Sequence, residues 1–180
     1  MYRLSIVCLF VVFLAGCASS PQSRAPESYT HEQAIEVRLA NLGASDLAMK
    51  SLRIAAEKSK SETPLRVEFY DCVFDNINAQ TLNEMMLPVY KKYYTKEDAL
   101  EIIALLSTPL GKKFKTSVQN AASPDQPAVV FTPEENREFA KYARLFQGPA
   151  ITKMNEELKQ EGKRIGMEKA KPCVKYLKAS

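Results

Sequence analysis

The sequence contains one histidine, no tryptophan and only six glycines among its 180 residues. A single histidine excludes a metal site built from several histidines, and it would have to serve alone in a catalytic triad. The scattered glycines exclude a collagen-like or low-complexity chain, and the 46% hydrophobic content argues against disorder. Beyond Gly16, no apolar run approaches the length of a membrane span. The length and composition therefore indicate one globular domain.

Residues 1–16 have the pattern of a secretory signal peptide. Arg3 precedes an apolar run over residues 4–13, which leads into the tetrapeptide Leu-Ala-Gly-Cys at 14–17. This tetrapeptide resembles the lipobox of bacterial lipoproteins, whose cysteine is joined to diacylglycerol before the preceding bond is cleaved. The resemblance implies removal of residues 1–16 and a lipid anchor at Cys17. Because Ala18 rather than aspartate follows, it also points to the outer membrane, with the domain facing the periplasm.

Residues 17–29 are expected to form the lipidated start of the mature chain and a flexible tether. They are polar, contain two prolines and have no helical periodicity. A tether of about 12 residues reaches at most roughly 40 Å when extended. The folded part is then a single domain over residues 30–180.

The expected periplasmic location determines how the four cysteines are interpreted. Cys8 leaves with the signal peptide and Cys17 is acylated, so that Cys72 and Cys173 remain as thiols. In an oxidising periplasm, two remaining cysteines suggest one disulfide. A cross-link over about 100 residues stabilises a fold by up to roughly 4.7 kcal/mol in the chain-entropy model. A redox or nucleophilic cysteine is the alternative, although no Cys-x-x-Cys motif is present.

From Thr30 onward the apolar residues recur with helical spacing, which predicts an all-α fold. We expect a compact bundle of about six or seven helices. Capping residues or prolines mark candidate helix starts near Thr30, Ser45, Thr63, Thr95, Thr108, Thr132 and Gly148, and a further helix is expected from about Ala79.

Two stretches of the chain share a sequence signature, which predicts two related αα-hairpins. In the first, Thr95 caps a helix with acidic residues in its first turn, and Thr-Pro-Leu-Gly at 108–111 begins the next helix. We expect Gly111 to let the two helix backbones approach closely. The second copy, over about residues 131–165, has a similar start but is about one helical turn longer.

The first copy resembles the domain-of-unknown-function 2059 family of bacterial envelope and secreted helical proteins. The resemblance is carried by Leu-Pro-Val-Tyr-Lys-Lys-Tyr-Tyr-Thr-Lys-Glu-Asp at 87–98 and by Ser-Thr-Pro-Leu-Gly-Lys-Lys-Phe at 107–114. It covers a family-like core of about residues 78–122. The family implies an all-α fold and a periplasmic setting, and it brings no established catalytic residues to transfer.

Few residues suggest catalysis. His31 begins a sequence like the zincin motif, but Ile35 stands where the second histidine ligand is required, so no zinc site is expected. Two acidic groups would offer the paired carboxylates of a peptidoglycan hydrolase. The helix dipole also favours acidic residues in first turns, which makes this interpretation weaker. No nucleophile elbow, phosphate loop or dinucleotide motif is present, and no cofactor is expected. The acidic groups are Glu97, Asp98 and Glu101, and Glu134, Glu135 and Glu138.

Two further features bear on binding. A methionine and four tyrosines would line a pocket for a small ligand between the hairpins, or else belong to the core. Residues 151–180 carry a net charge of +4 and would touch anionic lipid or lipopolysaccharide phosphates, or else form a solvated helix face. No nucleic-acid partner is expected in this compartment. The candidate pocket residues are Met86, Tyr90, Tyr93, Tyr94 and Tyr142.

The sequence thus predicts a lipid-anchored periplasmic helical domain acting as a non-enzymatic binding or envelope-maintenance module. A carrier of a small apolar ligand is the alternative function. A peptidoglycan-acting hydrolase is the third.

Overall fold

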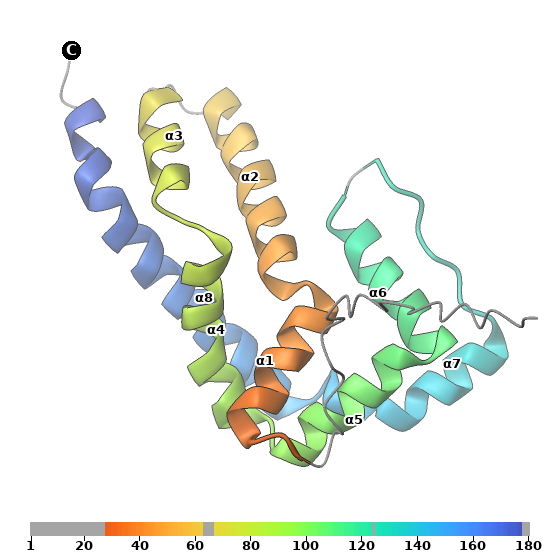
Figure 1. Ribbon diagram of the computed structural model, residues 1–180. Coiled ribbons are helices and arrows are strands. Elements are labelled where there is room, and N and C mark those ends of the chain that lie inside the picture. The colour runs from red at the N-terminus through yellow and green to blue at the C-terminus, as the bar shows by residue number, and fades with distance from the viewer. Residues whose placement is uncertain (1–27, 63–66, 124, 178–180) are drawn as a thin grey trace, which may run out of the picture.

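The computed structural model describes residues 28–62, 67–123 and 125–177, and in these ranges helices are the only regular secondary structure (Figure 1). The prediction of an all-α fold is confirmed. Residues 1–27, with the lipobox and Cys17, and the predicted cap at Thr63 lie outside the described ranges. The elements are α1 (His31–Leu42), α2 (Ala44–Glu62), α3 (Val67–Asp75), α4 (Ala79–Tyr93), α5 (Lys96–Ser107), α6 (Pro109–Ala121), α7 (Pro133–Phe139), η2 (Ala140–Leu145), α8 (Pro149–Ala170) and η3 (Lys171–Leu177), where η marks a 3-10 helix.

Most of the helices begin at the predicted capping residues, whereas α2 already begins at Ala44, one residue before the predicted cap Ser45. Thr30, Thr95 and Thr132 each accept a hydrogen bond from the backbone N–H three residues later, and the side chain at that position bonds back to the threonine N–H. These reciprocal bonds satisfy donors that a helix start leaves free. α1 ends at Gly43, whose φ of 67° is a left-handed conformation that glycine adopts without strain. The predicted caps at these three positions are confirmed.

The helices form two connected groups that diverge in Figure 1. One group contains α2, α3, α4, α8 and η3, and in it α8 lies along α4. The other contains α5 and α6 with α7 and η2, and α1 packs against both α5 and α4. The two groups meet again where the Lys50 ammonium on α2 donates a hydrogen bond to the Ser123 hydroxyl after α6. The shared core therefore lies around α1.

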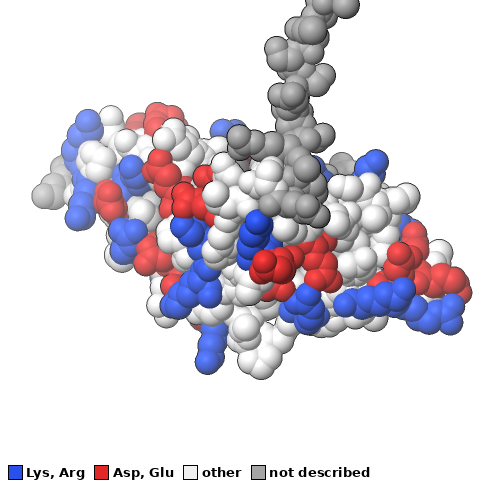
Figure 2. All heavy atoms as spheres, turned by 60° about the horizontal axis from the view of Figure 1, so that its bottom comes forward, with Lys and Arg blue, Asp and Glu red and all other residues white. Residues whose placement is uncertain are grey.

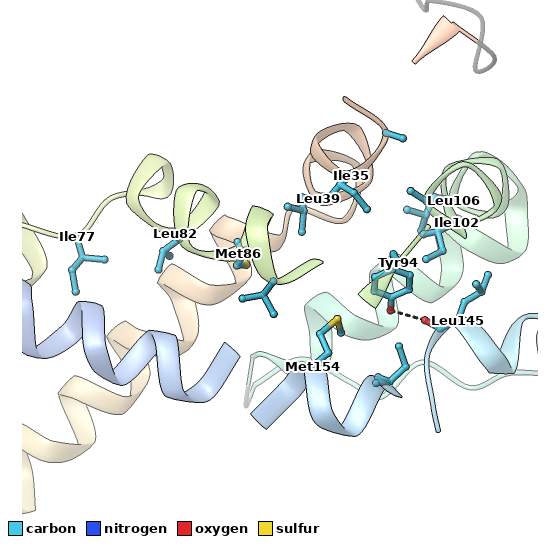
Figure 3. Packing of buried hydrophobic residues seen from close by; sticks show 14 residues of the cluster. Ile35, Leu39, Ile77, Leu82, Met86, Tyr94, Ile102, Leu106, Leu145 and Met154 are labelled. Carbon is cyan, nitrogen blue, oxygen red and sulfur yellow. Dashed lines mark hydrogen bonds between the residues drawn. The ribbon is translucent and has the colours of Figure 1, made fainter. Parts of the chain in front are cut away.

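Side chains from both groups fill this core (Figure 3). Its buried residues come from α1, α4 and the residues that flank α4, α5, the end of η2 and the first turns of α8. Ile35, Ile102 and Leu145 are among the largest side chains that are fully buried. Burying each such side chain contributes about 1.5–3 kcal/mol. The buried residues labelled in Figure 3 are Ile35, Leu39, Ile77, Leu82, Met86, Tyr94, Ile102, Leu106, Leu145 and Met154.

The α5–α6 corner is as close as Gly111 predicts. A Cβ atom at Gly111 would lie 1.9 Å from the carbonyl oxygen of Leu105, so only glycine fits there. The Thr108 hydroxyl donates to that same oxygen at 2.7 Å and accepts from the Gly111 N–H at 3.0 Å. The corner is therefore fixed by a missing side chain and one bridging hydroxyl.

The second copy of the signature begins like the first and then departs from it. α7 is short and continues as η2, and α8 packs along α4 with further contacts to α3 and η3 rather than pairing with α7 as α6 pairs with α5. Phe139 and Phe146 pack against Phe114 of α6, with ring centroids 4.8 and 4.9 Å away. These rings hold α7 and η2 on the first hairpin, so α8 buries its own apolar face against α4.

A disulfide fastens the C-terminal element. Cys72 on α3 and Cys173 on η3 are bonded, with their Cα atoms 5.7 Å apart, and Cys173 is fully buried. This Cα separation is normal for a disulfide. Within the described ranges, no helix is long and apolar enough to cross a membrane.

Candidate functional site

The five residues predicted to line a ligand pocket belong to the core cluster or pack against it. Met86 and Tyr94 are buried, whereas Tyr90, Tyr93 and Tyr142 are partly buried at its edge. Tyr90 and Tyr94 stack at 5.8 Å, one helical turn apart. The Tyr93 hydroxyl instead donates to Glu157 on α8. The structure thus brings Tyr90 and Tyr94 together on one side and directs Tyr93 toward α8.

The stacked pair holds an arginine that the pocket prediction did not include. The Arg38 guanidinium carbon lies 4.5 Å from the centroid of the Tyr90 ring and 4.1 Å from that of Tyr94. Arg38 is only 3% exposed, and its Nε and Nη1 atoms have no hydrogen-bond partner within the described part of the chain. The faces of the two rings attract the cation in place of a carboxylate.

The helical spacing of the apolar residues around Arg38 indicates that this arginine is buried. It lies between Ile35 and Leu39 on the buried face of α1. A cation inside an apolar face marks a buried charge that needs a partner. The sequence does not say that this partner is a pair of tyrosine rings on α4 and its C-cap.

Tyr94 connects the arginine to two other elements. Its hydroxyl donates a 2.7 Å hydrogen bond to the Leu145 carbonyl at the end of η2 (Figure 3), and its own carbonyl lies 2.7 Å from His31 Nε2. Burial raises the pKa of the Tyr94 phenol, and the nearby Arg38 charge opposes that rise. The phenol therefore stays protonated and keeps its hydrogen bond at neutral pH.

A shallow hollow of about 400 Å³ lies at the α4–α5 junction. Two of its lysines are engaged in ion pairs: Lys91 with Glu32 at 2.5 Å, and Lys92 with Glu157 at 2.7 Å. The hydrogen bonds that Lys92 and Tyr93 donate to Glu157 raise the pKa of both donors. The same two bonds lower the pKa of Glu157. The lining residues are His31, Lys91, Lys92, Tyr93, Tyr94, Thr95 and Lys96.

The candidate catalytic carboxylates are mostly bound to cations. Arg144 bonds both Asp98, at 2.5 Å, and Glu101. Burial alone would raise the pKa of Asp98, but the bonds from Arg144 and from Thr95 hold it below its usual value. In the second acidic group, Glu135 pairs with Lys113 at 2.6 Å and its pKa is lowered by that bond.

The remaining members of these groups are exposed. Glu134 pairs with Arg137 at 2.9 Å, and Glu97 and Glu138 lie at the surface. A general acid needs a raised pKa near the working pH, so Asp98 and Glu135, whose pKa values are lowered, do not suit that role. Among the described residues, no cluster of three or more histidine, cysteine or acidic side chains is placed to hold a metal ion.

A surface groove of about 440 Å³ runs between α1 and α4. Leu39, Ala40 and Leu87 give it an apolar floor, and amide and carboxylate side chains form its rim. On the face shown in Figure 2, acidic and basic side chains lie beside one another in small groups. The rim residues are Glu36, Gln80, Asn83 and Glu84.

A comparison with protein families finds a match that includes helices of this site. Residues 80–128 match the model of a family described as "Uncharacterized protein conserved in bacteria (DUF2059)". The match confirms the resemblance seen in the sequence, and it covers nearly all of α4 and all of α5 and α6. No curated protein and no solved structure matches the chain. Tyr90, Tyr94 and Gly111 lie in the DUF2059 segment, whereas Arg38 and both disulfide cysteines lie outside it.

Proposed function

We propose that this protein is a lipoprotein of the bacterial envelope whose helical domain serves as a non-enzymatic binding or envelope-maintenance module. The observation that carries the proposal is the Leu-Ala-Gly-Cys tetrapeptide at 14–17, directly after an apolar run and a single N-terminal cation. Acylation of Cys17 would attach two or three chains to the mature protein. Each buried CH₂ contributes roughly 0.8 kcal/mol, and two chains already suffice for stable anchoring.

The disulfide between Cys72 and Cys173 supports the compartment. Such bonds persist in the bacterial periplasm and are uncommon in the reducing cytosol. The export pattern of residues 1–16 and the oxidised cysteine pair are independent lines of support for the same location, because one depends on the local sequence and the other on the packing of α3 against η3.

The ion-paired carboxylates support the non-enzymatic part of the proposal. Asp98, Glu101 and Glu135 each contact a cation, and the pKa values of Asp98 and Glu135 are lowered. These side chains hold helices together, and the groove between α1 and α4 leaves a surface for binding.

Fatty-acid labelling tests the anchor. Cells that express the wild-type chain are grown with an alkyne-labelled palmitate, and the membrane fraction is then extracted with and without detergent. We expect label on the wild-type protein and release only by detergent. Cys17→Ser should carry no label and should leave the membrane or accumulate as precursor. Cys8→Ser is the matched control, since it alters a cysteine within the preceding apolar run and should retain label.

Equal labelling of Cys17→Ser and the wild-type chain would exclude Cys17 as the acylated residue. Absence of label on both would exclude the lipoprotein proposal.

A further inference from the structure

Charge is distributed unevenly along α8 and η3. Residues 149–162 contain two lysines and three glutamates, whereas residues 163–177 contain five basic residues and one glutamate. The basic end is the end of α8 that continues into η3, beside the start of α3 (Figure 1). Residues 163–177 thus carry a net charge of +4, against −1 for residues 149–162, and the neighbouring α3 contributes three acidic residues on the inner side.

The basic end also exposes apolar side chains. Met167 is 67% exposed, Val174 is 39% exposed and Leu177 is 38% exposed. α8 and η3 together form one rod, and its buried side contains Met154 on α8 and Cys173 on η3. Surfaces of soluble proteins routinely expose single apolar residues. These side chains therefore indicate a binding surface only because they lie among the cations.

Helical spacing places basic and apolar residues on one outer face. Lys163, Met167 and Lys171 follow one another at intervals of four, and Val174 comes one further turn along. All four are exposed, and within the described residues neither Lys163 nor Lys171 forms an ion pair. Arg164, one position away, is paired with Glu161 and Glu168. We call Lys163, Met167, Lys171 and Val174 the outer stripe.

The disulfide keeps this end of the molecule ordered. η3 is bonded through Cys173 to Cys72 on α3, and α3 also packs against α8. The contacts with α3 and α4 occupy the inner side of the α8–η3 rod, which leaves the outer stripe uncovered. The stripe is therefore part of a rigid surface rather than of a loose tail.

We propose that the outer stripe is a docking surface for a bilayer that contains anionic phospholipid. Lysines over apolar side chains are the chemistry of an interfacial helix: the ammonium groups reach the lipid phosphates, and the apolar groups enter the headgroup region. The inference rests on the proposed lipid anchor, because a chain tethered at Cys17 holds this weak surface near a membrane at high effective concentration.

Charge complementarity favours a bilayer over a protein partner. A membrane offers many phosphates that diffuse to meet isolated cations, and it does not require the deep apolar pocket that anchors a protein interface. Each lysine or arginine near an anionic surface strengthens binding by about five-fold. The two unpaired lysines of the stripe and Lys175 therefore suffice for weak, salt-sensitive attachment, which the tether would make persistent.

Vesicle binding of the unacylated chain tests the proposal without interference from the anchor. The full mature chain, residues 17–180 with Cys17→Ser, is mixed with phosphatidylcholine vesicles that contain or lack phosphatidylglycerol, and bound protein is measured by sedimentation. We expect binding only to the anionic vesicles and its loss at about 1 M salt, where the Debye length is about 3 Å. Lys163→Glu with Lys171→Glu should lower the partition coefficient by roughly 30-fold or more.

The matched control is Lys112→Glu with Lys141→Glu, which changes the net charge equally at exposed positions on α6 and η2. This control should lower the partition coefficient by less than about three-fold, because charges beyond a Debye length are screened. Met167→Ser should reduce it by roughly 3- to 10-fold through lost apolar contact. Circular dichroism is expected to show the same helicity in all variants.

Three results would overturn the proposal: no binding to anionic vesicles, equal binding to vesicles with and without phosphatidylglycerol, or an equal fall of the partition coefficient in the stripe and control variants. Each of these leaves the lipid anchor standing if Cys17 is labelled in cells. Conversely, unlabelled Cys17 with stripe-dependent vesicle binding would refute the anchor alone.

Discussion

Arg38 is a cation held in an apolar interior by two tyrosine rings, with no carboxylate of the described chain bonded to it. Burying an unpaired charge costs several kcal/mol, and each desolvated cation–π contact returns about 2 kcal/mol. The rings of Tyr90 and Tyr94 thus offset part of the cost of burying the charge. The rest of that cost remains, because two nitrogen atoms of the guanidinium have no hydrogen-bond partner within the described part of the chain. Arg38 is better explained by filling space between α1 and α4 than by its charge.

Two substitutions of Arg38 separate volume from charge. Arg38→Met keeps most of the side-chain volume, and we expect its free energy of unfolding to stay within about 1 kcal/mol of wild type or to rise. Arg38→Ala leaves a cavity beneath the tyrosine rings and should lower that free energy by about 2–4 kcal/mol. Urea denaturation measures both. An equal loss in the two variants would show that the guanidinium charge, not its volume, stabilises the fold.

The buried hydroxyl of Tyr94 makes a second prediction. Tyr94→Phe leaves the Leu145 carbonyl without its donor and should cost about 1–3 kcal/mol at neutral pH. Tyr90→Phe is the control, because Tyr90 stacks in the same pair but has no hydroxyl partner among the described residues, and it should cost less than about 0.5 kcal/mol. Similar losses in both variants would contradict the assigned role of the hydrogen bond.

The same residue gives a pH dependence. Burial raises the pKa of Tyr94 above the value of 10.0 that it has when exposed in the unfolded chain. Its contribution to stability is therefore complete below that unfolded value and is lost as the pH rises through the folded pKa. The advantage of wild type over Tyr94→Phe should shrink between about pH 9 and about pH 11 in urea titrations. An advantage that stays constant or grows over this range would contradict the burial of a neutral phenol.

Sequence patterns reveal some residues and conceal others for physical reasons. Caps such as Thr95 and Thr132 were predictable because they act within one helical turn. Gly111 was predictable because a glycine in the first turn of a helix that starts with Thr-Pro points to a close backbone approach. The partners of Arg38 were not, since they lie on a different helix far along the chain and depend on how α1 packs on α4.

Among the elements, the α5–α6 corner brings two helix backbones close together. Its geometry depends on the absence of a side chain at Gly111, where the nearest obstacle is backbone and cannot move aside. The corner lies inside the DUF2059 segment, so the matched part of the chain contains a hairpin with a fixed bend. The second copy has Gly148, with φ of 112°, at the equivalent junction, and there the following helix leaves in another direction.

Two alanine substitutions test the corner. Gly111→Ala should destabilise the fold by at least about 3 kcal/mol, because it forces the α5 and α6 backbones apart. Gly162→Ala is the control: it lies inside α8, where an added Cβ atom would meet nothing within 4 Å, and should stabilise by about 0.5–1 kcal/mol. Thermal unfolding followed by circular dichroism measures both. A harmless Gly111→Ala would refute the close approach.

The repeated signature shows how far element-level prediction reaches. Both copies begin with a capping box followed by a helix, as their local sequences indicate. Whether the next helix folds back depends on long-range packing: Phe139 and Phe146 contact Phe114, which fixes α7 and η2 and frees α8 to lie on α4. Sequence similarity between the copies carries no information about that choice.

For the whole molecule, the disulfide is the covalent link between two distant segments. It joins residues separated by 101 positions, so it limits the unfolded chain strongly while fastening only η3 in the folded one. The chain-entropy model gives about 4.7 kcal/mol for a loop of this length, and measured values are usually about 2–4 kcal/mol. The sequence suggested this pairing by elimination, from the export signal and the number of cysteines left.

Removing the disulfide should lower the free energy of unfolding by about 2–4 kcal/mol. Cys72→Ser with Cys173→Ser is compared with wild type in urea, with and without a reducing agent. The reducing agent should bring wild type to the level of the double variant and leave the variant unchanged. Equal stability of oxidised and reduced wild type would contradict a stabilising link.

The intact mass of the protein, purified from the envelope in detergent and kept unreduced, tests the central claim most directly. We predict a chain that begins at Cys17, carries diacylglycerol with or without a further acyl group, and has the mass of one disulfide between Cys72 and Cys173. A chain that retains residues 1–16, or one that lacks lipid at Cys17, would contradict the proposed lipoprotein.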